Sequence, residues 1–319
     1  MVSYFTIDAI GEIVNFQKEI SNMMHGFGDN PNPNAATVVM VEKIVLQQLK
    51  TMLQDANHFS TMRGSKAISN YEIIYLLRNN TIKLKRLQNY QLKLDQIDSK
   101  CQINLDRISS TDSMIPGIIL EDEKDPTLKK RRTHIDCIRE FDEFDEVRRV
   151  KFDVIDYLRK IRAAKITESM TFEKYEAYHK ARCTSFRAAG YGIGSKSYAK
   201  LERWINPTKE YKLTQAALEV LCFVAYETVA EIVDAVFLIR QDGKKKSGDP
   251  FSKYEGGHFC NPVSLNNAVY IKSGYEGVQA ITVAEVREVL RRFFSPGTGM
   301  NGLFYRNMSL DLPIRYIAI

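Results

Sequence analysis

The sequence predicts an all-α protein in which two copies of one motif, a long helix between two short helices, pair within a single chain. Three observations predict this class. Two long apolar segments have helical periodicity, an arginine ends each of them, and a capping box follows each arginine. One copy cannot bury both sides of its own long helix, so each copy needs a partner of the same shape.

The first copy spans residues 14–90. A short amphipathic helix is predicted at 15–27, a loop rich in Gly, Asn and Pro at 28–34, and a long helix at 35–63. Apolar residues recur every three or four positions along the long helix, as a buried helix face requires. Gly64 can end this helix, because glycine adopts the left-handed conformation common just after helix C-termini.

The second copy spans residues 195–300 and repeats this order of elements. A short helix is predicted at 195–205, a long helix at 215–242 and a last helix at 281–296. An insert at about 243–280 separates the long helix from the last one. Its content of Gly, Ser, Asn and Lys is typical of a long surface loop.

The two copies share a pattern where the long helix ends and the last helix begins. An arginine is followed by Ser or Thr and, three positions later, by Glu: these are Arg63, Ser69 and Glu72 in the first copy, and Arg240, Thr282 and Glu285 in the second. Ser or Thr with Glu at this spacing predicts a capping box at the start of the last helix. Nine positions separate arginine from glutamate in the first copy and 45 in the second, so the insert adds about 36 residues.

The remaining segments are a linker and a tail. Residues 91–190 are densely charged with both signs, and the second half of the segment EDEKDPTLKK…RAAK has enough apolar residues for one or two helices. They are predicted to form a charged linker with probable helices, partly mobile in the free chain. The C-terminal tail at 301–319 is either a strand or a docking peptide, and both interpretations stay open.

The apolar run at 216–242 is long enough to cross a membrane, but four acids interrupt it: Glu219, Glu227, Glu231 and Asp234. A carboxylate near the centre of a membrane helix costs roughly 2.5–3.5 kcal/mol, so we predict a helix of a soluble protein. On a helix these four acids and Asp242 fall within an arc of about 140°, opposite an apolar arc of about 220°. We expect the apolar arc to be covered on more than one side and the acidic stripe to lie in water.

The composition limits the class of protein. The chain of 319 residues is 44% hydrophobic and 26% charged, as in ordinary globular proteins, and its net charge of +6 permits an anionic partner without requiring one. Five scattered cysteines without a CxxC pair predict free thiols in a reducing compartment. The first residues lack the pattern of a secretory signal.

No catalytic, cofactor or metal site is predicted. The stretch GYGIGSKS at 190–197 has the wrong glycine spacing for a phosphate-binding loop, which favours a hinge. His134 with Cys137, and His258 with Cys260, are half-sites without the further ligands of a structural zinc site. No nucleophile–base arrangement is recognisable from spacing alone, so no catalytic residue is predicted.

The order short–long–short, with an arginine before the second loop and an acid in the first turn of the last helix, resembles the histone fold. The family pattern R-G-x-x-x-I-T-P-E-D corresponds here to residues 63–72, RGSKAISNYE, with Glu72 in place of the usual Asp and no Pro. Ion pairs between Arg63 and Glu72, and between Arg240 and Glu285, are therefore expected. The two copies are expected to pair head to tail, with the first loop of each beside the second loop of the other.

Further motifs resemble the suppressor-of-Ty histone-fold subunits of the SAGA transcription coactivator, which carry two histone folds in one chain. They are FQKEISNMMHGFGD at 16–29, LLRNNTIKLKRL at 76–87, and AYETVAEIVDAVFLIRQD at 225–242 followed by KSGDPFS. The resemblance implies a non-enzymatic nuclear protein without cofactors that recruits or regulates TBP at RNA polymerase II promoters. It also implies other SAGA core subunits, histone-fold subunits among them, as partners.

Two binding hypotheses follow. If the acidic stripe faces outward, Glu227, Glu231 and Asp234 can contact a basic patch of TBP. The alternative is a histone-fold module that binds DNA directly and non-specifically through basic groups: Lys83, Lys85 and Arg86, and the three lysines at 244–246. The acids on both long helices make DNA the secondary partner, and no membrane contact is expected.

Overall fold

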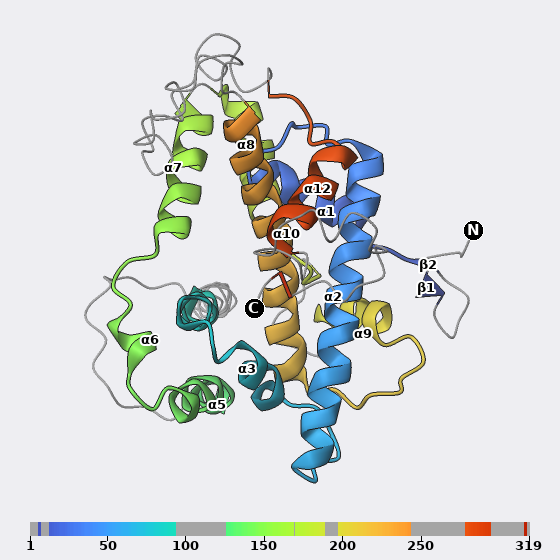
Figure 1. Ribbon diagram of the computed structural model, residues 1–319, viewed down its shortest axis with the longest axis vertical. Coiled ribbons are helices and arrows are strands. Elements are labelled where there is room, and N and C mark those ends of the chain that lie inside the picture. Colours follow the sequence, from blue (N-terminus) through green and yellow to red (C-terminus); the bar gives the residue numbers. More distant parts are fainter. Residues whose placement is uncertain are drawn as a thin grey trace, which may run out of the picture. The chain divides into compact units, whose positions relative to one another are not determined.

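The computed structural model describes residues 6–7, 13–93, 126–168, 170–188, 197–243, 278–294 and 316–317. This part of the chain is mostly helical (Figure 1), as predicted. Two short strands, β1 (Thr6–Ile7) and β2 (Ile13–Val14), pair in antiparallel fashion. None of the helices in these ranges is sufficiently long and apolar to span a membrane.

The helices follow the predicted order. In the first copy they are α1 (Gln17–Gly26), α2 (Ala35–Met62), α3 (Asn70–Leu77) and a helix at 81–93. The middle of the chain forms α5 (Pro126–Phe141), α6 (Glu146–Arg149), α7 (Val154–Glu168) and α8 (Phe172–Arg182). The second copy forms α9 (Ala199–Ile205), α10 (Gln215–Gly243), α12 (Val283–Val289) and the π-helical turn η6 (Leu290–Phe294).

The chain divides into two compact units, and α2 and α10 each contribute to both. The first compact unit consists of residues 1–51, 152–186 and 224–318. The second consists of residues 52–151 and 187–223, with Ile319. Neither compact unit is continuous in sequence, so each depends on segments that lie far apart along the chain.

In the first compact unit, the loop after α1 lies against the segment that leads into α12. Asn30 Nδ2 donates to the carbonyl of Val278 at 2.7 Å, and the Ile281 amide donates to Asp29 Oδ1 at 3.0 Å. The Thr37 hydroxyl donates to the Ile281 carbonyl at 2.7 Å. The first loop of the first copy thus lies beside the second loop of the second copy, as the head-to-tail arrangement predicts.

The second compact unit contains the reciprocal contact. The Ile68 amide donates to the Lys212 carbonyl at 2.8 Å, and the Thr214 amide donates to the Ile68 carbonyl at 3.0 Å. Ile68 and Leu213 therefore form a parallel β-bridge. The second loop of the first copy is tied to the first loop of the second copy by backbone hydrogen bonds, which satisfy donors and acceptors that neither loop satisfies alone.

Local helix signals are confirmed where the structure describes them. Both capping boxes are present: Ser69 with Glu72 at the start of α3, and Thr282 with Glu285 at the start of α12. Gly64 follows α2 with a φ of 72°, the left-handed conformation predicted for it.

The middle of the chain has more helices than predicted. Four helices, α5 to α8, lie between residues 126 and 182, where the sequence analysis expected one or two. In the first compact unit α8 packs closely on α1: the Tyr178 hydroxyl donates to the Gly26 carbonyl at 3.2 Å. A side chain at Gly26 would lie 3.1 Å from the Ala181 carbonyl, so glycine permits this approach.

Some predictions fall outside the described residues. Most of the insert at 243–280 is outside them, as are the proposed hinge at 190–196 and the His258–Cys260 half-site. Of the tail at 301–319, only residues 316–317 are described. There the Ile317 amide donates to Gln48 Oε1 at 3.1 Å in a buried position.

Candidate interaction surface

We expected the acidic stripe of α10 to lie in water, but the structure buries much of it. Within the first compact unit, α7 covers it. Glu227 is buried with 5% exposure, and Glu231 and Asp234 are partly buried. The expectation of an outward row of carboxylates is therefore wrong for Glu227 and Asp234. The reason is that α7 supplies arginines to this face of α10.

The pairing between α7 and α10 is direct. Arg159 Nε donates to Asp234 Oδ2 at 2.7 Å, and Arg159 Nη1 lies 3.1 Å from both carboxylate oxygens of Glu227. Arg162 Nη1 donates to Asp234 Oδ1 at 2.7 Å. Glu227 and Asp234 are seven positions apart, which is two helical turns, so both carboxylates face the same side of α10.

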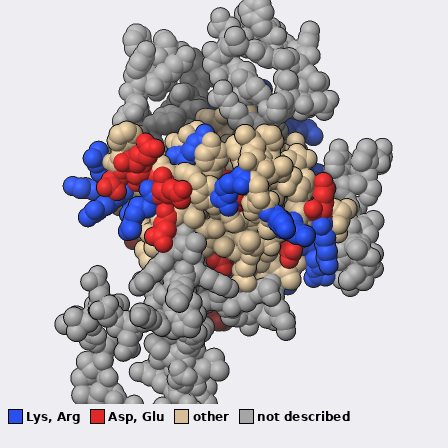
Figure 2. Space-filling model, turned by 90° about the horizontal axis from the view of Figure 1, so that it is seen from below, with Lys and Arg blue, Asp and Glu red and all other residues tan. Residues whose placement is uncertain are grey.

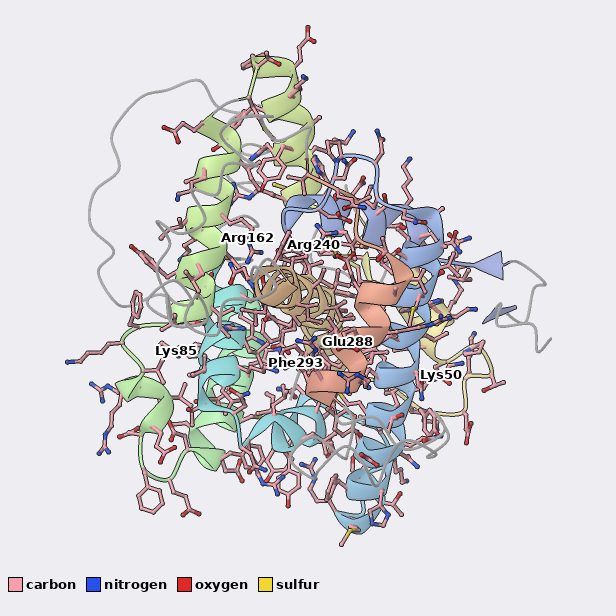
Figure 3. All side chains as sticks on the ribbon, turned by 45° about the horizontal axis from the view of Figure 1, so that its top comes forward. Lys50, Lys85, Arg162, Arg240, Glu288 and Phe293 are labelled. Carbon is pink, nitrogen blue, oxygen red and sulfur yellow. The ribbon has the colours of Figure 1, made fainter. Side chains whose placement is uncertain are left out.

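Aromatic rings and a backbone carbonyl complete the surroundings of the two arginines. Arg162, labelled in Figure 3, also donates from Nη1 to the Phe27 carbonyl at 3.0 Å. The Arg162 guanidinium lies 4.7 Å from the centre of the Phe237 ring. The Arg159 guanidinium lies 5.7 Å from the Phe27 ring. A Cβ on Gly28, whose φ is 114°, would be 2.9 Å from the Arg162 side chain, so this glycine leaves room for the arginine.

The electrostatics favour the charged forms of these groups. Burial lowers the pKa of Arg159, but the charges of Glu227 and Asp234 and their hydrogen bonds outweigh it, so its pKa stands above the ordinary value. Burial raises the pKa of Asp234, yet Arg159 and Arg162 hold it below the ordinary value. Arg159 and Asp234 are therefore both charged at neutral pH.

In the second compact unit, α5 covers the N-terminal end of the same stripe. His134 is buried, and its Nε2 lies 3.3 Å from Glu219 Oε2 on α10. Its Nδ1 lies 2.8 Å from Asn70 Nδ2 on α3, and the same amide is 3.7 Å from the Cys137 sulfur. His134 thus links three helices as a buried hydrogen-bonding residue. Nowhere in the described ranges do three His, Cys, Asp or Glu side chains gather as metal ligands.

Both loop ion pairs expected from the sequence are present, with different geometry. Arg240 contacts Glu285 through Nε at 2.6 Å and Nη2 at 3.1 Å. Arg63 Nη2 lies 3.1 Å from Glu72 Oε1, near enough for an ion pair but without hydrogen-bond alignment. The guanidinium of Arg63 also lies 4.3 Å from the Tyr71 ring.

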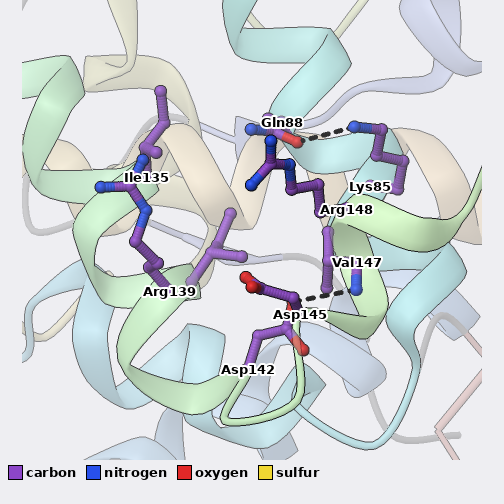
Figure 4. Close-up of a pocket in the computed structure, with 9 residues that line it drawn as sticks. Lys85, Gln88, Ile135, Arg139, Asp142, Asp145, Val147 and Arg148 are labelled. Carbon is purple, nitrogen blue, oxygen red and sulfur yellow. Dashed lines mark hydrogen bonds between the residues drawn. The ribbon is translucent and has the colours of Figure 1, made fainter.

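A pocket of about 410 Å³ lies in the second compact unit, between the helix at 81–93, α5 and α6 (Figure 4). Six ionic or polar side chains and three aliphatic ones line it: Lys85, Gln88, Arg139, Asp142, Asp145 and Arg148, with Ile135, Ile138 and Val147. Both oxygens of Asp142 accept backbone N–H groups at the start of α6. Among the described residues that line the pocket there is no cysteine, serine or histidine.

The described basic residues that were considered for DNA binding do not form an exposed basic surface. Lys83 and Arg86 are buried, and Lys85 donates to Gln88 Oε1 at 3.2 Å beside the pocket. The lysines at 244–246 lie outside the described residues. On the face shown in Figure 2, the described basic and acidic side chains are interspersed rather than gathered by sign.

Sequence reasoning missed the residues on α7 and α5 that engage α10. Arg159 and Arg162 are three positions apart, a spacing that puts both on one face of a helix. The acids of α10 at positions 227 and 234 are seven positions apart, which also puts both on one face of a helix. Both patterns can be seen in the sequence. Nothing in the sequence, however, indicates that these arginines pair with these acids.

The helix order and the paired loops place the protein in the histone-fold class. Residues 14–106 match the family model described as transcription initiation factor IID, 18kD subunit, which carries this fold.

The resemblance found in the sequence is confirmed by relatives along almost the whole chain. The chain is 27% identical to SAGA complex subunit Spt3 of Drosophila melanogaster over 96% of its own length and 74% of that protein. It is 22% identical to SAGA complex subunit Spt3 of Schizosaccharomyces pombe, over 90% of this chain and 92% of that one. A shorter match is to transcription initiation factor TFIID subunit 13 of Arabidopsis thaliana, 37% identical over 22% of this chain and 55% of that protein.

Proposed function

We propose that this chain is a non-enzymatic subunit of a SAGA-type transcription coactivator, that it works in the nucleus, and that it recruits or regulates TBP at promoters. The observation that carries the proposal is the similarity to Drosophila SAGA complex subunit Spt3 over 96% of the chain. Similarity of this extent includes both copies and the segment between them, so it is not limited to a shared helical motif.

The proposal includes a second histone fold at residues 195–300 that pairs with the first within the chain. Two contacts support it: Asp29 and Asn30 against the segment at 278–281, and Ile68 against Lys212 and Thr214. Each joins a first loop of one copy to a second loop of the other. A chain that supplies both members of such a pair needs no separate partner to bury its two long helices.

Membership in the complex is tested by purification. An affinity-tagged chain, expressed at its native level, is isolated from nuclear extract and its co-purifying proteins are identified by mass spectrometry. We expect SAGA core subunits in stoichiometric amounts. Recovery with TFIID subunits alone, or with neither complex, would contradict the proposal.

Within this function, we propose that the stripe of Glu227, Glu231 and Asp234 contacts TBP. Glu231 is the residue to change first, because it is partly exposed whereas Glu227 is buried against Arg159. Glu231→Lys is expected to weaken binding of purified chain to purified TBP at least tenfold at physiological salt. Glu176→Lys, on the exposed face of α8, is the matched control and should bind as the wild type does.

Circular dichroism of both variants separates loss of binding from loss of fold. If Glu231→Lys binds TBP with unchanged affinity, the acidic stripe is not the contact. Direct DNA binding is not proposed as a second function, because two of its three candidate residues in the described ranges, Lys83 and Arg86, are buried.

A further inference from the structure

We propose that α7 is an internal ligand of the acidic face of α10, and that an arginine-bearing segment of a partner protein displaces it. This inference deepens the proposed function, on which it rests for the identity of the partner, because it concerns access to Glu227, Glu231 and Asp234. The acidic face of α10 is then a binding surface that the chain itself occupies until a partner with the same chemistry competes.

The surface is suited to guanidinium groups rather than to any cation. Two carboxylates, two turns apart, accept hydrogen bonds from planar donors at 2.7 and 3.1 Å. The Phe27 carbonyl accepts a further bond, and the Phe27 and Phe237 rings lie beside the guanidinium groups. Arginine fits such a site better than lysine, because its fork of N–H groups matches carboxylates and its flat face stacks on rings.

The fit of α7 is incomplete. Arg159 Nη2 and Arg162 Nε are buried, yet they find no hydrogen-bond acceptor among the described residues. Each buried donor without an acceptor loses the hydration that it had in water and gains nothing in return. A partner segment whose donors are all satisfied on this surface therefore has an advantage over α7.

Apart from the two arginines, α7 is held chiefly near its C-terminal end, where Ile166 packs with Tyr178 and Val278. Only Ala163 and Ile166 of this helix are buried. At its N-terminal end Val154, Ile155 and Tyr157 are exposed, at 49%, 45% and 45%. The first half of α7 thus buries little apolar surface, and its attachment to α10 depends mainly on the two arginines.

The first test uses a fluorophore-labelled peptide with the sequence of residues 154–168. It asks whether the acidic face of α10 binds an arginine-bearing segment supplied as a separate molecule. The chain with Arg159→Gln and Arg162→Gln should bind this peptide at least tenfold more tightly than the wild type, because its own α7 no longer competes. A chain with Lys151→Gln and Lys160→Gln, two exposed cations, is the control and should bind as the wild type does. A peptide carrying both arginine-to-glutamine changes should not bind.

Unlabelled TBP added to the bound peptide separates this inference from the proposed function. Displacement of the peptide by TBP supports both the inference and the proposed TBP contact. Tight peptide binding without displacement by TBP retains α7 as an internal ligand and rejects TBP as its competitor. Equal weak binding of the peptide to all three chains overturns the inference.

Amide hydrogen exchange of the wild-type chain is the second measurement, and it does not depend on whether the double variant folds. The amides of α7 should exchange much faster than those of α10, at least tenfold, because α7 detaches while the core stays folded. Exchange of α7 at the rate of α10 would show that the two helices open only together, and would reject a displaceable α7.

Discussion

Arg240 holds Glu285 through two contacts, Nε to Oε1 at 2.6 Å and Nη2 to Oε2 at 3.1 Å. The same guanidinium donates to the carbonyls of Gln279 and Ala280 at 2.9 and 3.2 Å. Arg240, in the last turn of α10, thereby fixes both the loop before α12 and the first turn of α12. Arg63 occupies the corresponding position in the first copy, but its side chain is 47% exposed against 19% for Arg240.

This difference predicts unequal effects of two matching substitutions. Arg240→Ala should lower the free energy of unfolding by about 2–3 kcal/mol, because four hydrogen bonds to a largely buried guanidinium are lost. Arg63→Ala should cost less, about 1 kcal/mol, since the Arg63 side chain is about half exposed and its contact with the buried Glu72 lacks hydrogen-bond alignment. Urea denaturation followed by fluorescence of Trp204, the single tryptophan and a buried one, measures both. Equal losses of unfolding free energy in the two variants would contradict this prediction.

The contact with Arg240 also affects the pKa of Glu285. Burial raises the pKa of Glu285, but its bonds to Arg240 and to the Thr282 amide outweigh burial and hold the pKa below its ordinary value. The stabilisation is therefore present above the unfolded pKa of about 4.3 and is lost as the pH falls through the lower folded value. In Arg240→Ala this acid-induced loss should be smaller, which urea titrations at pH 5 and pH 3 would reveal.

The hydroxyl of Thr37 tests the junction between the two copies in the first compact unit. It is buried and donates to the Ile281 carbonyl, 244 residues further along the chain. Thr37→Val keeps the shape and removes the donor, so it should cost about 1–3 kcal/mol because the buried carbonyl loses a partner. Thr51→Val is the matched control: that hydroxyl donates within its own helix, to Gln47, and is exposed. The control should change the unfolding midpoint little.

Gly64 offers a test of backbone conformation without packing. Its φ is 72°, and an added Cβ would meet no atom within 4 Å. Gly64→Ala should therefore cost about 1 kcal/mol through the left-handed conformation alone, and Gly64→Asn should cost less because asparagine tolerates that conformation. If alanine and asparagine destabilise the protein equally, a contact rather than the backbone is responsible.

His25 gives the protein a dependence on pH near neutrality. Burial lowers the pKa of His25, and the hydrogen bond between Nδ1 and the Asp29 carbonyl, at 3.3 Å, only partly offsets this. Below the unfolded pKa of about 6.5 the unfolded chain binds a proton that the folded chain does not, so stability falls as the pH decreases towards the lower folded pKa. His25→Gln should reduce this slope between pH 7 and pH 5, as measured by urea denaturation. If the pH dependence of stability is unchanged in His25→Gln, a group other than His25 causes it.

Much of the helical architecture could be read from local patterns. The bounds of α2 and α10, the two capping boxes and the left-handed Gly64 depend on residues within a few positions of one another. The head-to-tail contact of the loops also followed from the sequence, because two long helices of the same shape can cover each other's apolar faces in few ways.

The acidic stripe could not be predicted in the same way. That the acids of α10 share one helix face follows from their positions along the chain, since it depends only on helical spacing. Whether water, a partner or the chain's own α7 covers that face was decided by the tertiary structure, which brings Arg159 next to Glu227, 68 residues away. Charges of both signs were abundant in the linker, so local sequence did not specify which arginine would find which carboxylate. That choice depends on where the intervening helices place their faces, because ion pairs form only between groups that folding has already brought into contact.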